Sequence, residues 1–367
     1  MEGRLPSIDG ETARCSAWGF NTIGNWSENR LCELHRIPYT RAISVFELTY
    51  KKPGEIDFVG VPHFGNGQYQ FADIFAPLFR KHLLATNGVF ADLPTHEVSL
   101  DPWCLGVFVD NELPWSAGQL AEKHGLVRTI LEKPGPAAVK KAFWKRLSQY
   151  YGSIAALNAA WGSKLSVSRF EDLMNKAVIL PAIENDSMRK DLEDLTGFYA
   201  EHYFSTVRKV FRRYLPNTLY LGSRFDAWTP QAVKNVSARY MDVVSFNVYD
   251  RNLGHARYAT VPYDKPMLVS EFHFGATDRG AIRGGIVTVR NQKKRAKVYV
   301  KFAQSVLDNS SFVGFHWFQY ADEPVTGRYG DGENFNCGLV DVMDIPYPEL
   351  TEAAAKFNRL VYKKIKA

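Results

Sequence analysis

The feature that most constrains the fold is a series of short apolar runs that alternate with segments of helical periodicity. Seven runs are rich in β-branched and aromatic residues and are nearly continuous in apolar character: Trp18–Gly24, Arg41–Glu47, Leu105–Asp110, Leu219–Phe225, Val243–Tyr249, Met267–Phe272 and Val313–Tyr320. This pattern is typical of strands that are covered on both faces. The segments between them repeat apolar residues three and four positions apart, as one face of a helix does. Strands that alternate with helices predict parallel β-α units and an α/β fold.

Seven β-α units favour a (β/α)8 barrel of the TIM type over a doubly wound sheet, because no glycine-rich nucleotide-binding motif follows any run. A closed barrel of this type needs eight strands. Residues 11–17 indicate the end of a helix, so we expect the barrel to lack its first strand at the N-terminus of this chain. The alternative is that residues 58–63 form a further strand.

We expect one catalytic domain over residues 1–367, with a helical insertion around residues 113–190. No Pro- or Ser-rich linker and no internal repeat divides the sequence. The insertion is long for a connection between a strand and a helix, and insertions at the active end of a barrel usually shape the site.

Composition excludes several classes of protein. The chain is 46% hydrophobic and 14% aromatic, which excludes global disorder. Its net charge of +6 is spread along the chain, so a nucleic-acid partner is not expected. No apolar run approaches the ~20 residues of a membrane-spanning helix, so no membrane partner is expected either. The four cysteines lack metal-binding spacing, and we expect neither a metal nor a cofactor.

The N-terminal residues contain no apolar signal core, but an upstream extension could direct a longer form to the periplasm or outside the cell. The compartment therefore stays open at this stage, as does the oligomeric state.

Two predicted strands each end in a carboxylate. Asn111 and Glu112 follow the run GVFVD, and Glu271 lies near the end of MLVSEF. Active sites of barrel enzymes lie at the C-terminal ends of the strands. Two glutamates there are the pair that glycoside hydrolysis requires, one to protonate the leaving oxygen and one to attack the anomeric carbon. The alternatives are a polar strand end for Glu112 and a buried ion pair for Glu271.

Other polar and aromatic residues are candidates for substrate binding because they also follow predicted strands. Trp317 could form a floor for a sugar ring, although a core tryptophan is the alternative. Tyr249 could hold the nucleophilic carboxylate. The further candidates, each of which could instead make a purely structural hydrogen bond, are Asn247, Asn25, Trp26, Arg224, Asp226, His273, His316, Gln319 and Asp322. The acidic loop 322–336 lacks the spacing of a calcium-binding loop and is expected to contact substrate.

The order of these residues resembles the retaining barrel hydrolases of glycoside hydrolase clan A. In that clan the acid/base glutamate follows an asparagine at the end of strand four, and the nucleophile ends strand seven. Glu112 ends the third predicted strand and Glu271 ends the sixth, so the same offset of one strand applies to both. The stretches that resemble the β-agarases of glycoside hydrolase family 50 are 18–27, 106–115, 270–275 and 316–350. This sequence departs from the pattern of that family in two expected respects: the first barrel strand is absent, and so is the N-terminal sandwich-like domain that such enzymes usually carry.

The resemblance implies that Glu112 is the acid/base and Glu271 the nucleophile, and that Asn111 binds the 2-hydroxyl of the sugar. It also implies cleavage of β-1,4 galactosidic bonds of agarose or agaro-oligosaccharides, with retention and release of neoagarobiose. The expected partner is thus a galactan, and sulfated galactans and both endo and exo action stay open. The alternatives are a clan A β-galactosidase that acts on short galactosides and a catalytically silent carbohydrate-binding barrel.

Overall fold

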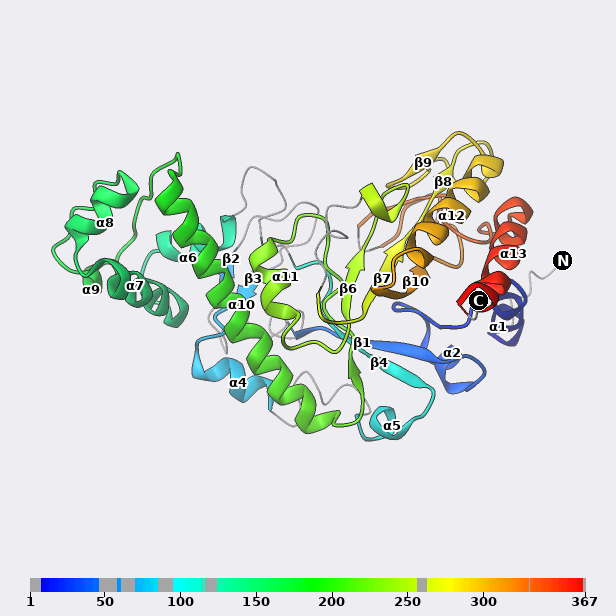
Figure 1. Cartoon of the computed structure of the whole chain (residues 1–367), viewed down its shortest axis with the longest axis horizontal. Helices are drawn as coiled ribbons and strands as arrows, with labels where there is room; N and C mark the ends of the chain where they lie inside the picture. The colour runs from blue at the N-terminus through cyan, green and yellow to red at the C-terminus, as the bar shows by residue number, and fades with distance from the viewer. Residues whose placement is uncertain are drawn as a thin grey trace.

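The computed structural model describes residues 8–45, 58–60, 70–84, 95–113, 115, 124–255, 263–329 and 331–365. Parallel strands lie at the centre of the molecule and helices lie around them (Figure 1). This arrangement confirms the predicted α/β fold.

The central strands are β1 (Tyr39–Ile43), β4 (Cys104–Val109), β5 (Leu219–Tyr220), β6 (Val244–Asn247), β7 (Met267–Phe272) and β10 (Phe312–Trp317). They form two parallel sheets, in the orders β1-β4-β5 and β6-β7-β10. A parallel bridge between Phe225 and Phe246 joins the two sheets, and a bridge from Ile23 to Tyr39 adds a seventh segment beside β1. All seven predicted runs therefore lie side by side in the order of the sequence.

The strands have apolar residues on both faces, as their nearly continuous apolar sequences predict. Val107 and Val109 of β4 lie in the large core that the helices cover. Phe108 points the other way, because successive side chains of a strand face opposite sides. It belongs to a small second cluster to which several strands each contribute residues, namely Phe108, Leu221, Val243 and Leu268, with Ala42 packed against them.

The helices are α1 (Ile8–Ala17), α2 (Asn29–Glu33), α4 (Pro77–Leu83), α5 (Thr95–Leu100), α6 (Gly125–Glu132), α7 (Ala138–Tyr151), α8 (Ile154–Trp161), α9 (Phe170–Leu173), α10 (Asp186–Tyr214), α11 (Gln231–Ser237), α12 (Gln292–Leu307) and α13 (Pro348–Ile365), with a 3-10 turn η2 (Leu253–His255). Side chains of Asn185 and Asn291 cap the first turns of α10 and α12. Within the described residues, no helix is long and apolar enough to span a lipid bilayer.

The stretch predicted as a helical insertion contains α6 to α9 and the start of α10. These helices form a lobe that projects to one side of the strands, and α10 runs from that lobe back across the sheet (Figure 1). The lobe has its own tightly packed interior, where Trp144 and Trp161 are buried with ring centroids 6.4 Å apart. Residues 114 and 116–123 of the predicted insertion lie outside the described residues.

Two short sheets lie apart from the central strands. β2 (Phe58–Gly60) pairs antiparallel with β3 (Gln70–Ala72), and β8 (Gly275–Ala276) pairs parallel with β9 (Thr288–Val289). The alternative that residues 58–63 supply another strand of the parallel series is therefore wrong for residues 58–60. Residues 61–63 lie outside the described part.

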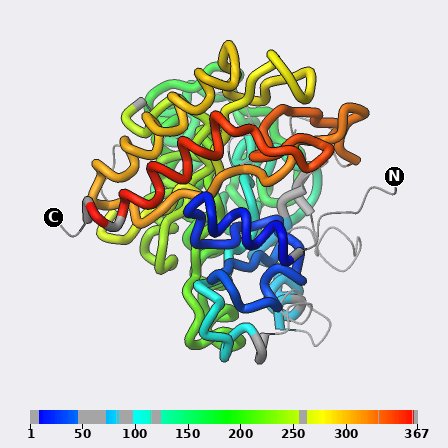
Figure 2. The backbone as a smooth tube through the Cα atoms, turned by 90° about the vertical axis from the view of Figure 1, so that its right-hand side faces the viewer, coloured from blue at the N-terminus to red at the C-terminus, as the bar shows by residue number. Residues whose placement is uncertain are grey.

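The first and last helices lie side by side, α1 in blue and α13 in red (Figure 2). Asn358 of α13 donates to the Trp18 carbonyl at 3.1 Å, and Arg359 donates to the Ala17 carbonyl at 2.7 Å. Gly19 has a φ of +80°, and a Cβ there would lie 2.7 Å from that of Asn358. A glycine is required at this point, where the first strand segment enters the fold beneath α13.

Candidate active site

The candidate site lies where the parallel strands end. Glu112 follows β4, Arg224 follows β5, Tyr249 follows β6 and Glu271 lies at the end of β7. Trp26 follows the segment that contains Ile23, and the C-terminal ends of parallel strands lie at one edge of the sheet. Residues from five separate segments of the chain therefore converge there.

A bulge in β7 directs Glu271 into the site. Phe246 of β6 pairs with Val269, but Asn247 pairs with Glu271, so β7 contains one extra residue at this point. The pairing with β10 shows the same extra residue between Val269 and Phe272. A bulge of this kind redirects the side chains that follow it. Ser270 and Glu271 both make contacts within the site, although adjacent residues of a regular strand would face opposite sides.

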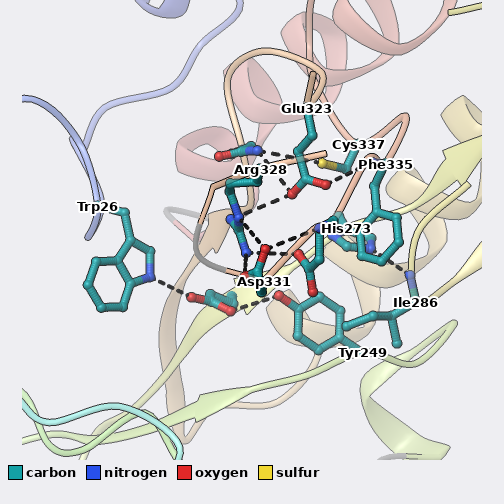
Figure 3. Close-up of polar contacts among 12 residues, drawn as sticks. Trp26, Tyr249, His273, Ile286, Glu323, Arg328, Asp331, Phe335 and Cys337 are labelled. Atoms are coloured by element: carbon teal, nitrogen blue, oxygen red, sulfur yellow. Dashed lines mark hydrogen bonds and ion pairs between the residues drawn. The ribbon is translucent and has the colours of Figure 1, made fainter. Parts of the chain in front are cut away.

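Three donors converge on the Glu271 carboxylate. Oε1 accepts from Trp26 Nε1 at 2.9 Å and from Arg224 Nη2, and Oε2 accepts from Tyr249 Oη at 2.7 Å. Figure 3 shows the Trp26 indole and the Tyr249 phenol on either side of the carboxylate that both contact. The buried ion pair considered as an alternative for Glu271 is thus present, with Arg224 only 1% exposed. This pairing stabilises the carboxylate charge while the group stays at the strand end.

Glu112 has a different environment, in which its acidic form is favoured. Loss of hydration, and then the nearby Glu271 carboxylate, hold the pKa of Glu112 well above the ordinary carboxyl value. Asn247 Nδ2 donates to Glu112 Oε1 at 2.9 Å and, with Arg224, opposes this rise in pKa. A carboxyl group whose protonated form is favoured, beside a second carboxyl group, is the arrangement that a general acid requires.

Asn111 links these two carboxyl groups through Arg224. Arg224 Nε donates to Asn111 Oδ1 at 2.8 Å, while Nη2 of the same guanidinium donates to Glu271. Asn247 Nδ2 also approaches Asn111 Oδ1, at 3.3 Å. Because its oxygen is occupied by these donors, the amino group of Asn111 is the end that can donate to a bound hydroxyl.

Four residues of the site have backbone conformations that are unfavourable for side chains other than glycine. Trp26, Asp110, Glu112 and Arg224 have φ values of +67°, +60°, +44° and +52°. Each such conformation costs about 1–3 kcal/mol and persists only where the surroundings enforce it. Asp110 supplies part of that enforcement, since its carboxylate accepts from the Val45 amide at 2.7 Å and from the Tyr203 hydroxyl.

Asn25, His316 and Arg224 each have a side-chain nitrogen atom without a hydrogen-bond partner among the described residues. Asn25 Nδ2, His316 Nδ1 and Arg224 Nη1 are buried and make no hydrogen bond with the described residues. Burial and the charge of Arg224 lower the pKa of His316 to about 4, so its ring is neutral at pH 7. These three nitrogen atoms therefore have unused hydrogen-bonding capacity within the described part of the chain.

His273 and Asp226 contact loops beside the glutamates. His273 Nε2 accepts from the Ile286 amide at 3.0 Å, and its ring packs edge-on against Tyr249. Burial and the charge of Arg295 lower its pKa to about 3, which keeps the ring neutral. Asp226 accepts from the amides of Trp228 and Thr229 at 3.0 and 2.7 Å and thereby fixes the turn that exposes Trp228.

The last group of predicted residues lies in or after β10. Trp317 packs edge-on against Phe272 and donates to the Cys337 carbonyl at 3.0 Å. Gln319 donates to Glu323 at 3.3 Å, and buried Asp322 accepts from the Tyr347 hydroxyl at 2.6 Å. These hydrogen bonds bind the loop after β10 to its surroundings, and none of them reaches Glu112 or Glu271.

One arginine of the acidic loop 322–336 lies among three of the loop's carboxylates. Arg328 donates to Asp331 at 2.5 Å and to Glu333 at 2.9 Å, and it lies 3.5 Å from buried Glu323 (Figure 3). Over the described ranges, no group of three or more His, Cys, Asp or Glu side chains could hold a metal ion. Three of the four carboxylates of this loop therefore gather around one arginine, and the fourth, Asp322, accepts from Tyr347.

Sequence reasoning missed the supports of the site. Ser270 contacts Asn247, and Tyr203 contacts Asp110, the residue before Asn111 and Glu112, yet none of these three was a candidate. A serine inside the apolar run MLVSEF was a usable signal, because a buried hydroxyl requires a hydrogen-bond partner. Tyr203 lies on α10, far from any strand end, and offered no such signal.

No family model matches the chain. It is 39% identical over 356 residues to β-agarase B of Vibrio sp. (strain JT0107), across 94% of this chain and 35% of that protein. It is 34% identical over 368 residues to β-agarase A of the same strain, across 95% of this chain and 35% of that protein. A solved exo-β-agarase structure superposes with a TM-score of 0.85 at 36% identity, covering 97% of this chain and 47% of the other.

These relatives place the chain among the glycoside hydrolases. More particularly, the chain belongs to glycoside hydrolase family 50, the family of the β-agarases. It spans about a third of the length of the curated relatives that it matches.

Proposed function

We propose that this chain is the catalytic region of a retaining β-agarase, which cleaves β-1,4 galactosidic bonds of agarose or agaro-oligosaccharides and releases neoagarobiose. The observation that carries the proposal is the joining of two glutamates from separate strand ends by one hydrogen-bonded network through Arg224, Asn111 and Asn247. The names and the similarity of the relatives support the substrate.

The fold that we infer is a (β/α)8-type barrel to which this chain contributes seven strands, organised as one domain with the α6–α9 lobe inserted. Seven parallel segments in sequence order and a small second core on their inner face support this arrangement. Among the described strands, β10 pairs with β7 on one edge, as expected for the last strand of a barrel whose first strand is missing.

In the first step of the proposed reaction, Glu112 donates its proton to the glycosidic oxygen while the Glu271 carboxylate attacks the anomeric carbon. The galactosidic bond breaks, and an ester between Glu271 and the sugar forms with inversion at that carbon. In the second step, Glu112 takes a proton from water, which attacks the same carbon and releases Glu271 with a second inversion. Asn111 is placed to donate to the 2-hydroxyl during both steps.

The site suits a substrate without strong charge. Arg224 is paired with Glu271, so most of its charge is neutralised before any ligand binds. Trp26 and Trp228 are 61% and 39% exposed at the strand ends, and such rings can stack on the apolar faces of galactose units. A neutral galactan fits these features better than a polyanion.

The experiment that tests the proposal uses truncation of each glutamate with azide rescue. We expect Glu271→Ala to lose activity on agaro-oligosaccharides by orders of magnitude and to regain part of it with azide, which yields an α-glycosyl azide. Glu112→Ala should instead give the β-glycosyl azide, because the ester on Glu271 still forms. Near-normal activity of either variant would contradict the assignment.

The two alternatives have distinct outcomes in the same assays. A β-galactosidase would hydrolyse nitrophenyl galactoside faster than agarose. A silent carbohydrate-binding barrel would bind agaro-oligosaccharides and release no product from any substrate.

A further inference from the structure

We propose that Ser270 is a positioning residue, whose hydroxyl fixes the side-chain amide of Asn247 so that its amino group faces Glu112. The inference rests on the proposed role of Glu112 as the acid/base.

The contacts form a short chain from the bulge of β7 to Glu112. Ser270 Oγ donates to Asn247 Oδ1 at 2.8 Å, and Asn247 Nδ2 donates to Glu112 Oε1 at 2.9 Å. Ser270 and Asn247 are each 2% exposed, so water does not compete freely for these atoms. An amide has distinct donor and acceptor ends, and its orientation therefore decides whether Glu112 meets a hydrogen or a lone pair.

A second contact keeps the amide from turning over. Asn111 Oδ1 lies 3.3 Å from Asn247 Nδ2 and accepts from Arg224 at the same time. A flip of Asn247 would bring two carbonyl oxygens together and would end the donation from Ser270 to Asn247 Oδ1. Ser270 thus anchors the oxygen end of the amide, while Asn111 Oδ1 opposes the flipped orientation at the other end.

The bulge explains why a serine can take this position. Phe246 and Asn247 are adjacent in β6 and pair with Val269 and Glu271 of β7. Ser270, which lies between these two residues of β7, is therefore the extra residue of the bulge. It is therefore placed beside Asn247 while the next residue, Glu271, still faces the site.

The charged and titratable groups that face Glu112 come from the ends of three strands. They are Glu271 on β7, Asp226 and Arg224 after β5, and Tyr249 after β6. Glu271 and Asp226 favour the protonated acid, whereas Arg224 and the amide of Asn247 favour the carboxylate. Loss of the oriented amide removes one of the two groups that favour the carboxylate, so the pKa of Glu112 should rise.

The direction of the effect follows for each half-reaction. The first step needs protonated Glu112, so the basic limb of kcat/KM should move to higher pH. The second step needs the Glu112 carboxylate in the glycosyl-enzyme, so the acidic limb of kcat should move to higher pH as well. Slower hydrolysis of the glycosyl-enzyme should lower kcat and KM together and leave kcat/KM nearly unchanged near its optimum.

The test compares Ser270→Ala with Ser237→Ala, a matched buried serine of α11 whose hydroxyl donates to the Lys234 carbonyl at 2.8 Å. We expect both limbs of Ser270→Ala to move upward by about half a pH unit to one unit, and kcat to fall about 3- to 10-fold. Ser237→Ala should show neither change. Limbs that stay in place in a folded Ser270→Ala protein overturn the proposal.

A second measurement does not depend on turnover. The carboxyl of Glu112 is titrated by ¹³C NMR in the wild type, in Ser270→Ala and in Ser270→Cys, which keeps the size of the side chain with a weaker donor. An upward shift in the order wild type, Cys, Ala supports the role of Ser270, and equal titration curves overturn it. If the three proteins show this order but the wild type does not cleave galactosides, the proposed function is refuted and the positioning role of Ser270 still stands.

Discussion

Trp26 and Glu271 lie 245 positions apart in the sequence and are joined by a hydrogen bond of 2.9 Å between the indole Nε1 and the carboxylate Oε1. The bond connects the first strand segment of the chain to the end of β7. It also places an exposed aromatic ring directly beside the proposed nucleophile, so one residue can both orient the carboxylate and contact a sugar.

Trp26→Phe tests the orienting part of this role, since it keeps an aromatic ring and removes the donor. Hydrogen bonds to charged groups contribute about 1.5–3 kcal/mol, so we expect kcat/KM on agaro-oligosaccharides to fall about 10-fold or more. The control is Trp103→Phe, which alters a ring that stacks on His35 with centroids 6.1 Å apart. Equal kinetics of the two variants would contradict the role of the indole donor.

Arg224→Lys should lower kcat strongly, even though the variant keeps the positive charge. A guanidinium donates in two directions at fixed geometry, here to Asn111 and to Glu271, and an ammonium group cannot reproduce that fork. We expect kcat to fall by about two orders of magnitude with the fold intact. Steady-state kinetics and circular dichroism check this, with Arg239→Lys in an exposed pair with Glu201 as the control.

The pH dependence should reveal Glu112 as the acid. Its pKa is raised, so it stays protonated above the ordinary carboxyl range, and the first step is lost only as the pH rises through that elevated pKa. Glu112→Gln should lack the basic limb of kcat/KM that the wild type shows, and substrates with good leaving groups keep the variant's turnover measurable. Glu271→Gln removes the neighbouring negative charge, and NMR titration of Glu112 should then show a lower pKa. A Glu112 that titrates at the ordinary value in the wild type would refute this account.

Tyr347→Phe separates stability from binding in the loop after β10. It removes a buried donor to Asp322 and a partner of Asn336, so unfolding free energy should fall by about 1–3 kcal/mol. Thermal melting should show a decrease of a few degrees, while KM stays nearly constant. Tyr329→Phe, at a fully exposed ring, is the control. A large rise in KM without loss of stability would instead assign Asp322 to substrate binding, as the sequence suggested.

Much of the fold could be predicted because the buried strands are nearly continuous apolar runs. Asn111, Glu112 and Glu271 stand out in those runs for the same reason, since carboxylates at the ends of apolar strands need a partner or a task. The contact predicted between Tyr249 and Glu271 is also present. The run Trp18–Gly24 was also predicted as a strand, and it contributes a single parallel bridge from Ile23 to Tyr39 rather than an extended ladder.

The remaining parts of the site depend on tertiary geometry that leaves little trace in local sequence. The fork of Arg224 needs two partners from different strands, and the support of Asp110 by Tyr203 needs α10 to cross beneath β4. Asp322 looks like a site residue by position, yet its hydrogen bonds lie with Tyr347 and Gly338. A polar residue at the end of a strand can bind substrate or make a structural hydrogen bond, and its polarity alone does not distinguish the two.

The extra residue in β7 lets two consecutive side chains share the inner face of the strands. Val269 and Phe272 both lie in the core that the helices cover, and Ser270 and Glu271 stand between them. A strand that kept both residues without the bulge would turn Glu271 toward the helices, whereas a strand that lacked Ser270 would keep Glu271 on the inner face and lose the hydroxyl that contacts Asn247. In comparisons of related chains, the residue before the glutamate is therefore as informative as the glutamate itself.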